Sequence, residues 1–196
     1  MPHITDSLAV SEAQKYRSIY GDASYKSFDH SVTFAKSFLD RVKAREGEFV
    51  LDLGCGPGYA TKLFFDRGFR VMGVDIASNS LLDEHQGLFP VLVCALWAVP
   101  VQIDADWGFC ADVMEHIPTE RVGEVLAFIR RSVRKSVFFN ISVREDGYGK
   151  VIGQTLHMTV RPEEWWLEQL QAHWGTAAQV AGQRGDYACF LVSPDA

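Results

Sequence analysis

The chain has 196 residues, of which 47% are hydrophobic and 22% charged, so it is long enough to bury a core with a ligand cleft. Its net charge of -6 argues against extensive contact with nucleic-acid backbone, which requires clustered lysine and arginine. No stretch approaches the ~20 apolar residues of a membrane helix, so we expect no membrane span. Without a basic segment and apolar run at the N-terminus, and with four scattered cysteines, we expect a cytoplasmic protein with buried free thiols.

The N-terminal part of the chain is predicted to be helical. Helical patterning covers residues 7–20 and 29–44, and we interpret residues 1–46 as a lead-in to a core over residues 47–196. Both parts are expected to form one domain, residues 1–196. Four apolar side chains of the second stretch share one predicted helix face: Phe34, Phe38, Leu39 and Val42.

From residue 48 onward, strands and helices alternate. Strands are predicted over residues 49–53, 69–75, 89–95, 107–111 and 136–143. Helices are predicted over residues 59–67, 79–85 and 120–131, and Pro162 opens a last one after a loop at 144–153. The tail at 174–192 predicts two antiparallel strands around a turn at 182–186. The alternation indicates an α/β fold with a doubly wound, mostly parallel sheet, whose ligand lies beyond the carboxyl ends of its strands.

A glycine-rich turn follows the first predicted strand and its Asp52. It reads Gly54-Cys55-Gly56-Pro57-Gly58. Glycine lets backbone N–H groups approach a ligand closely, and a helix beginning near Pro57 offers its positive end. The spacing matches neither the dinucleotide fingerprint nor the phosphate-binding P-loop, so a ligand other than a nucleotide pyrophosphate is implied.

Asp75 ends the second predicted strand, about 20 residues beyond the turn, where an acid can accept both hydroxyls of a ribose. A solvated strand-end acid is the alternative. The upstream turn favours the ribose role.

With a third motif, Asp112-Val113-Met114-Glu115-His116-Ile117-Pro118, residues 48–143 resemble the class I S-adenosylmethionine-dependent methyltransferases. The general resemblance, which includes residues 156–166, is to small stand-alone methyltransferases of bacteria and their phages. The resemblance implies a Rossmann-like, seven-stranded sheet. It also implies S-adenosylmethionine as the cofactor and S-adenosylhomocysteine as the product.

The resemblance also implies cofactor contacts. Asp52 and the loop residues Gly54, Cys55 and Gly56 would hold the methionine end, Asp75 the ribose and Ile76 the adenine. Family members commonly have an acidic and then a small residue after the third strand, where this chain has Cys94-Ala95-Leu96-Trp97. The backbones of Ala95 and Leu96 are therefore the adenine candidates, with Trp97 as a wall or a core residue. Further candidates are Cys110 and Ala111 beneath the cofactor and the lead-in aromatics Tyr16, Tyr20, Tyr25 and Phe28 above it.

Two histidines are the candidate catalytic residues. His157 could act as general base, because histidine titrates near neutrality, or it could fix its loop to a backbone carbonyl. His116, with Glu115, either buttresses its own loop or touches the acceptor. Asp112, Glu115, His116 and His157 could instead hold a divalent metal, as a similar stretch does in metal-assisted RNA 2'-O-methyltransferases and some quinone O-methyltransferases. The acidic net charge argues against RNA, and we expect no metal.

The expected activity is methyl transfer to an oxygen or nitrogen of a small-molecule, sugar-like or lipid-like acceptor. Nucleic acid is not an expected partner, and no oligomeric state is predicted. Two alternatives remain open. One is methylation of RNA, DNA or protein, with or without a metal; the other is a non-catalytic cofactor-binding module that regulates a partner.

Overall fold

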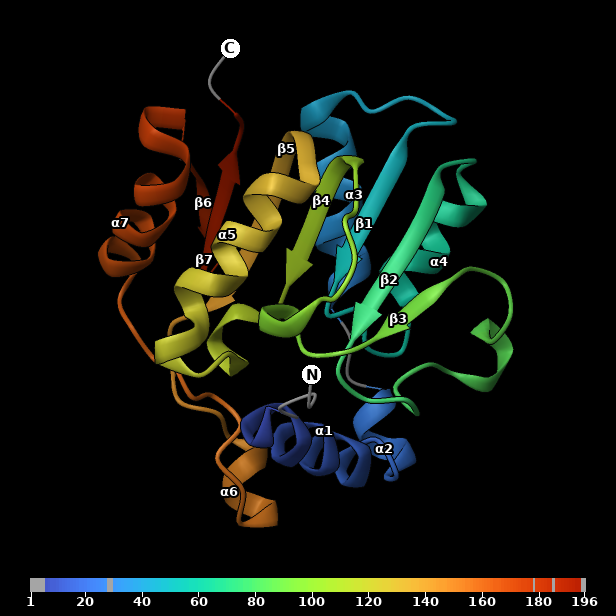
Figure 1. The fold of residues 1–196 in the computed structure, drawn as a ribbon, viewed down its shortest axis with the longest axis vertical. Coiled ribbons are helices and arrows are strands. Elements are labelled where there is room, and N and C mark those ends of the chain that lie inside the picture. Colours follow the sequence, from blue (N-terminus) through green and yellow to red (C-terminus); the bar gives the residue numbers. More distant parts are fainter. Residues whose placement is uncertain (1–5, 28–29, 178, 185, 195–196) are drawn as a thin grey trace, which may run out of the picture. The chain divides into compact units, whose positions relative to one another are not determined.

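The computed structural model describes residues 6–27, 30–177, 179–184 and 186–194. The chain forms two compact units, residues 1–102 and 103–196, each described by itself below (Figure 1). The single domain with a lead-in ending at residue 46 therefore stays a prediction. None of the described helices combines the length and apolar composition needed to cross a membrane.

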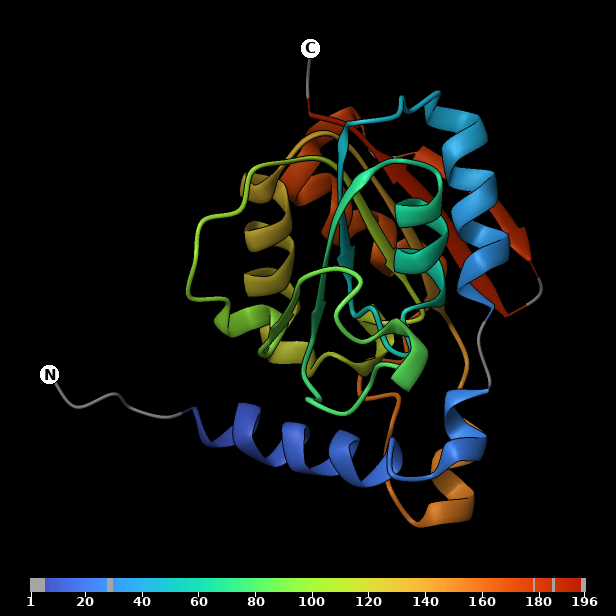
Figure 2. The ribbon, with the colours of Figure 1, turned by 90° about the vertical axis from the view of Figure 1, so that its right-hand side faces the viewer.

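The first unit contains three parallel strands in the order β3-β2-β1. Its elements are α1 (Ser7–Ile19), α2 (Ala23–Lys26), α3 (Ser31–Val42), β1 (Phe49–Leu53), α4 (Tyr59–Asp66), β2 (Arg70–Asp75), η1 (Asp83–His85), β3 (Val91–Val93) and η2 (Leu96–Ala98). The register aligns Leu53 with Val74 and Asp75 with Val93, so the strands end at one edge. Helices α3 and α4 pack against each other, and α4 packs on β1 and β2 (Figure 2).

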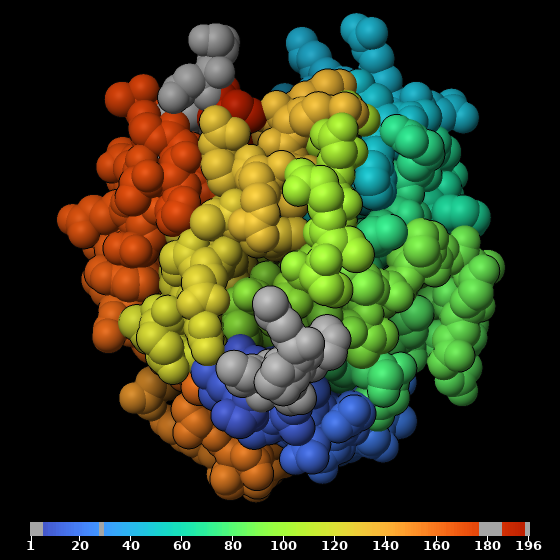
Figure 3. Space-filling view, viewed as in Figure 1, coloured from blue at the N-terminus to red at the C-terminus, as the bar shows by residue number. Residues whose placement is uncertain are grey.

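The second unit contains a parallel pair followed by two antiparallel strands, in the order β4-β5-β7-β6. Its elements are β4 (Ala105–Ala111), η3 (Met114–His116), η4 (Thr119–Arg121), α5 (Val122–Ser132), β5 (Val133–Ser142), α6 (Tyr148–Ile152), α7 (Glu163–Trp174), η5 (Gly175–Ala177), β6 (Gln179–Arg184) and β7 (Tyr187–Val192). Helix α5 packs on β5 and against α7, and α7 packs on β7. Figure 3 shows α5 (yellow) and α7 (orange) as adjoining surfaces.

Most predicted elements are present. The α/β class with mostly parallel strands is confirmed, and β1 has the predicted bounds. Side chains of Phe34, Phe38 and Leu39 are buried on α3 as expected, whereas Val42 is half-buried.

Three local predictions were wrong. The helix expected at 79–85 is only the 3-10 turn η1, because the Asn79 amide donates to the Arg17 carbonyl and the Ser80 N–H donates to that of Ala77. The strand expected at 89–95 is shortened to β3. The loop expected at 144–153 contains α6, where the Asp146 carboxylate accepts from the first-turn N–H groups of Tyr148 and Gly149. The turn expected at 182–186 includes residue 185, which lies outside the described residues.

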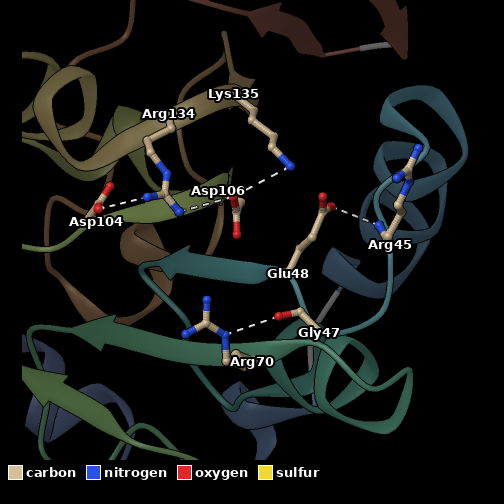
Figure 4. Close-up of polar contacts among 8 residues, drawn as sticks. All are labelled: Arg45, Gly47, Glu48, Arg70, Asp104, Asp106, Arg134 and Lys135. Carbon is tan, nitrogen blue, oxygen red and sulfur yellow. Dashed lines mark hydrogen bonds and ion pairs between the residues drawn. The ribbon is translucent and has the colours of Figure 1, made fainter.

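Charged side chains form ion pairs or hydrogen bonds with backbone atoms near the starts of several strands (Figure 4). In the second unit, Arg134 lies 2.9 Å from Asp104 and 3.2 Å from Asp106, and Lys135 lies 3.6 Å from Asp106. In the first, the Arg70 guanidinium donates to the Gly47 carbonyl. Arg130 and Arg131 lie in the last turn of α5, and the basic residues that follow in β5 form these ion pairs.

Adjacent tryptophans on α7 offer a test of the core. Trp166 is fully buried, whereas Trp165 is half-exposed and touches the Trp166 ring edge-on. Trp166→Ala should therefore lower the free energy of unfolding in urea by about 3–5 kcal/mol, because it leaves a large cavity. Trp165→Ala is the matched control and should cost clearly less. Equal losses in the two variants would contradict this packing.

Candidate functional site

The glycine-rich turn joins β1 to α4 at the edge where the strands of the first unit end. Gly54, Gly56 and Gly58 all have positive φ, at 74°, 50° and 86°. A Cβ at Gly58 would lie 2.8 Å from Leu81 and 3.2 Å from His85, so the turn needs glycine there for space as well as for conformation. The imidazole of His85 forms a 2.8 Å hydrogen bond with the Pro57 carbonyl through Nδ1 and so stabilises the turn.

The backbone N–H groups of the turn are used within the protein. Those of Gly54 and Cys55 donate to the Val74 carbonyl, that of Gly56 to Asp75, and that of Gly58 to the Cys55 carbonyl. These four N–H groups therefore hold the shape of the turn. The contacts of the turn with a ligand stay a prediction.

Asp75 ends β2 beside this turn and is buried. Its Oδ2 accepts from the Gly56 N–H at 2.9 Å, and its Oδ1 accepts from the Ala77 N–H at 2.8 Å. Burial raises the pKa of Asp75 to about 6, although these donors and the Ser80 hydroxyl oppose the shift. A carboxylate oxygen can accept more than one hydrogen bond, so Asp75 keeps acceptor capacity toward a ligand.

Asp52, near the end of β1, is also buried. Its Oδ2 accepts a 2.5 Å hydrogen bond from the hydroxyl of Thr61, in the first turn of α4. This bond ties strand to helix across the turn. Burial raises the pKa of the neighbouring Cys55 thiol, as do the negative charges of Asp75 and Asp52, and its sulfur packs where a side chain at Gly73 would otherwise stand.

Tyrosines of the lead-in reach the same turn. The Tyr20 hydroxyl lies 3.2 Å from the position of a Cβ on Gly56, and burial, with the charge of Asp75, raises the pKa of Tyr20 well above its usual range. Tyr16 is buried, with its ring centroid 6.4 Å from that of Tyr20, and Tyr25 meets Tyr20 edge-on at 5.3 Å. Phe28 lies outside the described residues.

Side chains beyond the strand ends fix the lead-in in place. The Trp97 indole N–H donates to the Asp6 carboxylate at 2.9 Å, so this tryptophan anchors the start of α1. The Lys26 ammonium donates to the Leu81 carbonyl at 2.8 Å. Among the adenine candidates, Ile76 is half-exposed, whereas the side chains of Ala95 and Leu96 are buried.

In the second unit, the remaining candidates follow the end of β4. Cys110 is fully buried and Ala111 half-buried. Asp112 then takes a positive φ of 61°, which is uncommon for a residue other than glycine, and its N–H donates to the Asn140 carbonyl of β5. Such conformations concentrate at functional sites.

Glu115 is fully buried in η3 and joins two chain segments. Its Oε1 accepts from the Ser142 N–H at the end of β5 at 2.7 Å, and its carbonyl accepts from the Thr159 N–H. Burial raises the pKa of Glu115 well above its usual range, and the Asp112 carboxylate nearby raises it further. Its Oε2 is buried without a hydrogen-bond donor among the described residues.

His116 and His157 lie edge to face, with ring centroids 4.8 Å apart. Nδ1 of His116 bonds the Leu156 carbonyl at 3.0 Å, and Nδ1 of His157 bonds the Arg144 carbonyl at 2.7 Å. Burial is the main reason that the pKa of His116 lies well below its usual range, and a charge on His157 would lower it further. The loop-fixing role weighed for both histidines is therefore present at Nδ1, and it sets the tautomer in which Nε2 carries the lone pair.

Several bracing residues carried no signal strong enough to single them out from sequence. Thr61 and His85 hold the turn, while Ser142 and Thr159 hold the segment after β4. Thr61 acts on Asp52, nine residues before it, whereas the partners of the other three lie 27 to 42 residues away, so only the register of the strands and loops reveals them.

Comparison with known proteins agrees with this geometry. Residues 51–141 match a family model described as a methyltransferase domain. A trans-aconitate 2-methyltransferase of Azoarcus sp. (strain BH72) is 38% identical over 104 residues, which cover 50% of this chain and 41% of that protein. A ubiquinone biosynthesis O-methyltransferase of Chromobacterium violaceum is 27% identical over 105 residues, covering 50% and 45%. The chain thus matches less than half the length of these curated relatives.

A solved structure shows the same fold. The magnesium protoporphyrin IX methyltransferase of Synechocystis PCC 6803, with bound S-adenosylhomocysteine, has a TM-score of 0.66 at 18% identity, over 97% of each chain. With the family match to residues 51–141, this fold confirms the resemblance seen in the sequence. Residues 51–141 are therefore a methyltransferase domain, and the chain has the Rossmann-like fold of that solved enzyme.

Proposed function

We propose that the protein transfers the methyl group of S-adenosylmethionine to an oxygen or nitrogen of a small-molecule acceptor. The observation that carries the proposal is the buried Asp75 carboxylate, held by the Gly56 and Ala77 N–H groups at the end of β2, beside a turn that only glycine can form. An ionised acid in that position suits two vicinal ribose hydroxyls.

The residues present fit this cofactor. Asp75 would accept from the ribose, and Ile76 would pack on the adenine. Gly54, Cys55 and Gly56 would let the methionine end approach the backbone, with Asp52 and the Tyr16 and Tyr20 hydroxyls toward its polar groups. Ala95, Leu96, Cys110 and Ala111 would complete the contacts. When bound, S-adenosylmethionine supplies an electrophilic sulfonium methyl, which the acceptor atom attacks in line with release of S-adenosylhomocysteine.

His157 and His116 are proposed on the acceptor side. A neutral imidazole can accept the proton that a hydroxyl or amine loses on methylation, and burial favours the neutral form of His116. Two observations support a small acceptor over a macromolecule. The curated relatives are named for trans-aconitate and for ubiquinone biosynthesis, and the chain carries a net charge of -6. A cytoplasmic location remains part of the proposal.

The role of Asp75 is tested by the pH dependence of S-adenosylhomocysteine binding, measured by calorimetry. Ribose hydroxyls donate to the ionised carboxylate, so affinity should rise with pH through about 6 and then level off. Asp75→Asn should abolish this dependence. Asp75→Ala should weaken binding at pH 8 by about 2–3 kcal/mol, or roughly 30- to 150-fold.

Asp83→Asn, which changes an exposed acid of η1, is the matched control and should bind like the unchanged protein. Unaltered affinity in Asp75→Ala would remove the ribose assignment.

The role of His157 is tested by incubating fractionated bacterial extract with methyl-labelled S-adenosylmethionine. His157→Ala should lower methyl transfer by about 100-fold or more while S-adenosylhomocysteine affinity stays within about twofold. His173→Ala, on α7, is the control and should retain activity. An equal loss of affinity and turnover would mean that His157 is only structural.

The same assay separates the alternatives. Label in a fraction that nuclease or protease destroys would favour a macromolecular acceptor. No label in any fraction, despite tight cofactor binding, would contradict catalysis and favour a regulatory module.

A further inference from the structure

Three side chains of the second unit converge after β4. Ligand atoms of Glu115, His116 and His157 all lie within 4.8 Å of one another; we call these residues the Glu-His cluster. They reach this point from two segments, because Glu115 and His116 belong to η3 while His157 follows α6. Four hydrogen bonds join the segments: Thr159 N–H to the Glu115 carbonyl, His116 to the Leu156 carbonyl, and the Thr159 hydroxyl with both the Ile117 carbonyl and the Thr119 hydroxyl.

The hydrogen bonds of both imidazoles select one tautomer. Since each Nδ1 lies against a backbone carbonyl, which only accepts, Nδ1 carries the proton and Nε2 the lone pair. This is the arrangement in which metal-binding histidines are usually held, with a backbone carbonyl orienting the ring from behind.

The carboxylate of Glu115 is held in a similar way. Its Oε1 is fixed by the Ser142 N–H, while its Oε2 is buried without a donor among the described residues. A buried carboxylate oxygen without a donor is costly unless a cation or a proton compensates it. The Asp112 carboxylate lies near enough to interact with Glu115, and it adds negative charge to the cluster.

We propose that the Glu-His cluster is a binding site for a divalent first-row transition-metal ion such as Zn²⁺, with Nε2 of His116, Nε2 of His157 and a carboxylate oxygen of Glu115 as ligands. Two imidazoles and one carboxylate favour such an ion over Mg²⁺ or Ca²⁺, which prefer oxygen ligands throughout. Around Zn²⁺, ligand atoms stand about 3–3.5 Å apart. Small rotations of the three side chains would therefore bring their ligand atoms to this spacing.

The site goes beyond the proposed methyl transfer and does not depend on it. Three protein ligands leave coordination positions open for water or for an oxygen of a bound molecule. An ion there would occupy the imidazole lone pairs, so the proton-accepting role proposed for His116 and His157 applies to the metal-free protein. The expectation of no metal, drawn from net charge, took no account of this local geometry.

The test uses the full chain without a histidine tag, treated with EDTA and titrated with Co²⁺ and then Zn²⁺. We expect one equivalent of Co²⁺ to give a visible absorption band that Zn²⁺ removes and that millimolar Mg²⁺ leaves unchanged. Glu115→Gln and His157→Ala should each weaken binding by at least about tenfold. Their matched controls, Glu145→Gln and His173→Ala, should bind like the unchanged protein.

A second measurement does not depend on the variants folding. In long-range ¹H–¹⁵N spectra, at least three of the six histidines should show protonated Nδ1 in the metal-free protein, namely His85, His116 and His157. Zn²⁺ should shift the Nε2 resonances of His116 and His157 and leave that of His85 unchanged. Absence of the cobalt band, or shifts confined to other histidines, would overturn the site. Binding of S-adenosylhomocysteine in EDTA reports separately on the proposed function, so failure of one does not imply failure of the other.

Discussion

The hydrogen bond from the Gly56 N–H to the Asp75 carboxylate is the interaction on which the first unit's site depends. A buried carboxylate is costly unless donors surround it, and backbone N–H groups are donors that substitution of a side chain does not remove. To point its N–H at Asp75, Gly56 takes a positive φ, and the turn around it must follow. The shape of the turn is thus a consequence of solvating one buried charge.

The second unit also buries a carboxylate, but it provides fewer hydrogen-bond donors to it. Glu115 is as deeply buried as any side chain there, yet only its Oε1 accepts the Ser142 N–H, and its Oε2 has no hydrogen-bond partner among the described residues. In the first unit, Asp75 receives donors at both oxygens. The contrast is physically informative, because an acid that is fully solvated by the protein can serve as a fixed acceptor, whereas one that is half solvated remains open to a proton or a cation.

Local patterns predicted most strands and the residues that stand at their ends. Each predicted feature of the first unit lies in or next to β1 or β2: the apolar run of β1, the glycines after it and the acid that ends β2. Their positions therefore follow from the parallel pairing of these two strands. The sequence did not predict the hydrogen-bond partner of each polar group. N–H groups of the turn donate to the Val74 carbonyl and the Asp75 carboxylate, and these partners depend on strand register rather than on any motif.

Longer-range contacts escaped prediction for the same reason. His116 and His157 meet only because Thr159 bonds the segment after β4, and Trp97 anchors Asp6 across most of the first unit. Helix α6 was missed because Asp146, whose carboxylate accepts from its first N–H groups, stands in a short stretch rich in glycine, which by itself favours a loop.

The weak attachment of α1 has a further consequence for access to the glycine-rich turn. This helix of 13 residues buries only Glu12, Tyr16 and Ile19, and its remaining attachments include polar contacts at Asp6 and Arg17. Elements held by so little apolar surface detach at a much lower free energy than the whole molecule unfolds. Amide protons of α1 should therefore exchange with solvent well before those of β1. Tyr20, which follows α1 and brings its hydroxyl close to Gly56, would move away together with the helix.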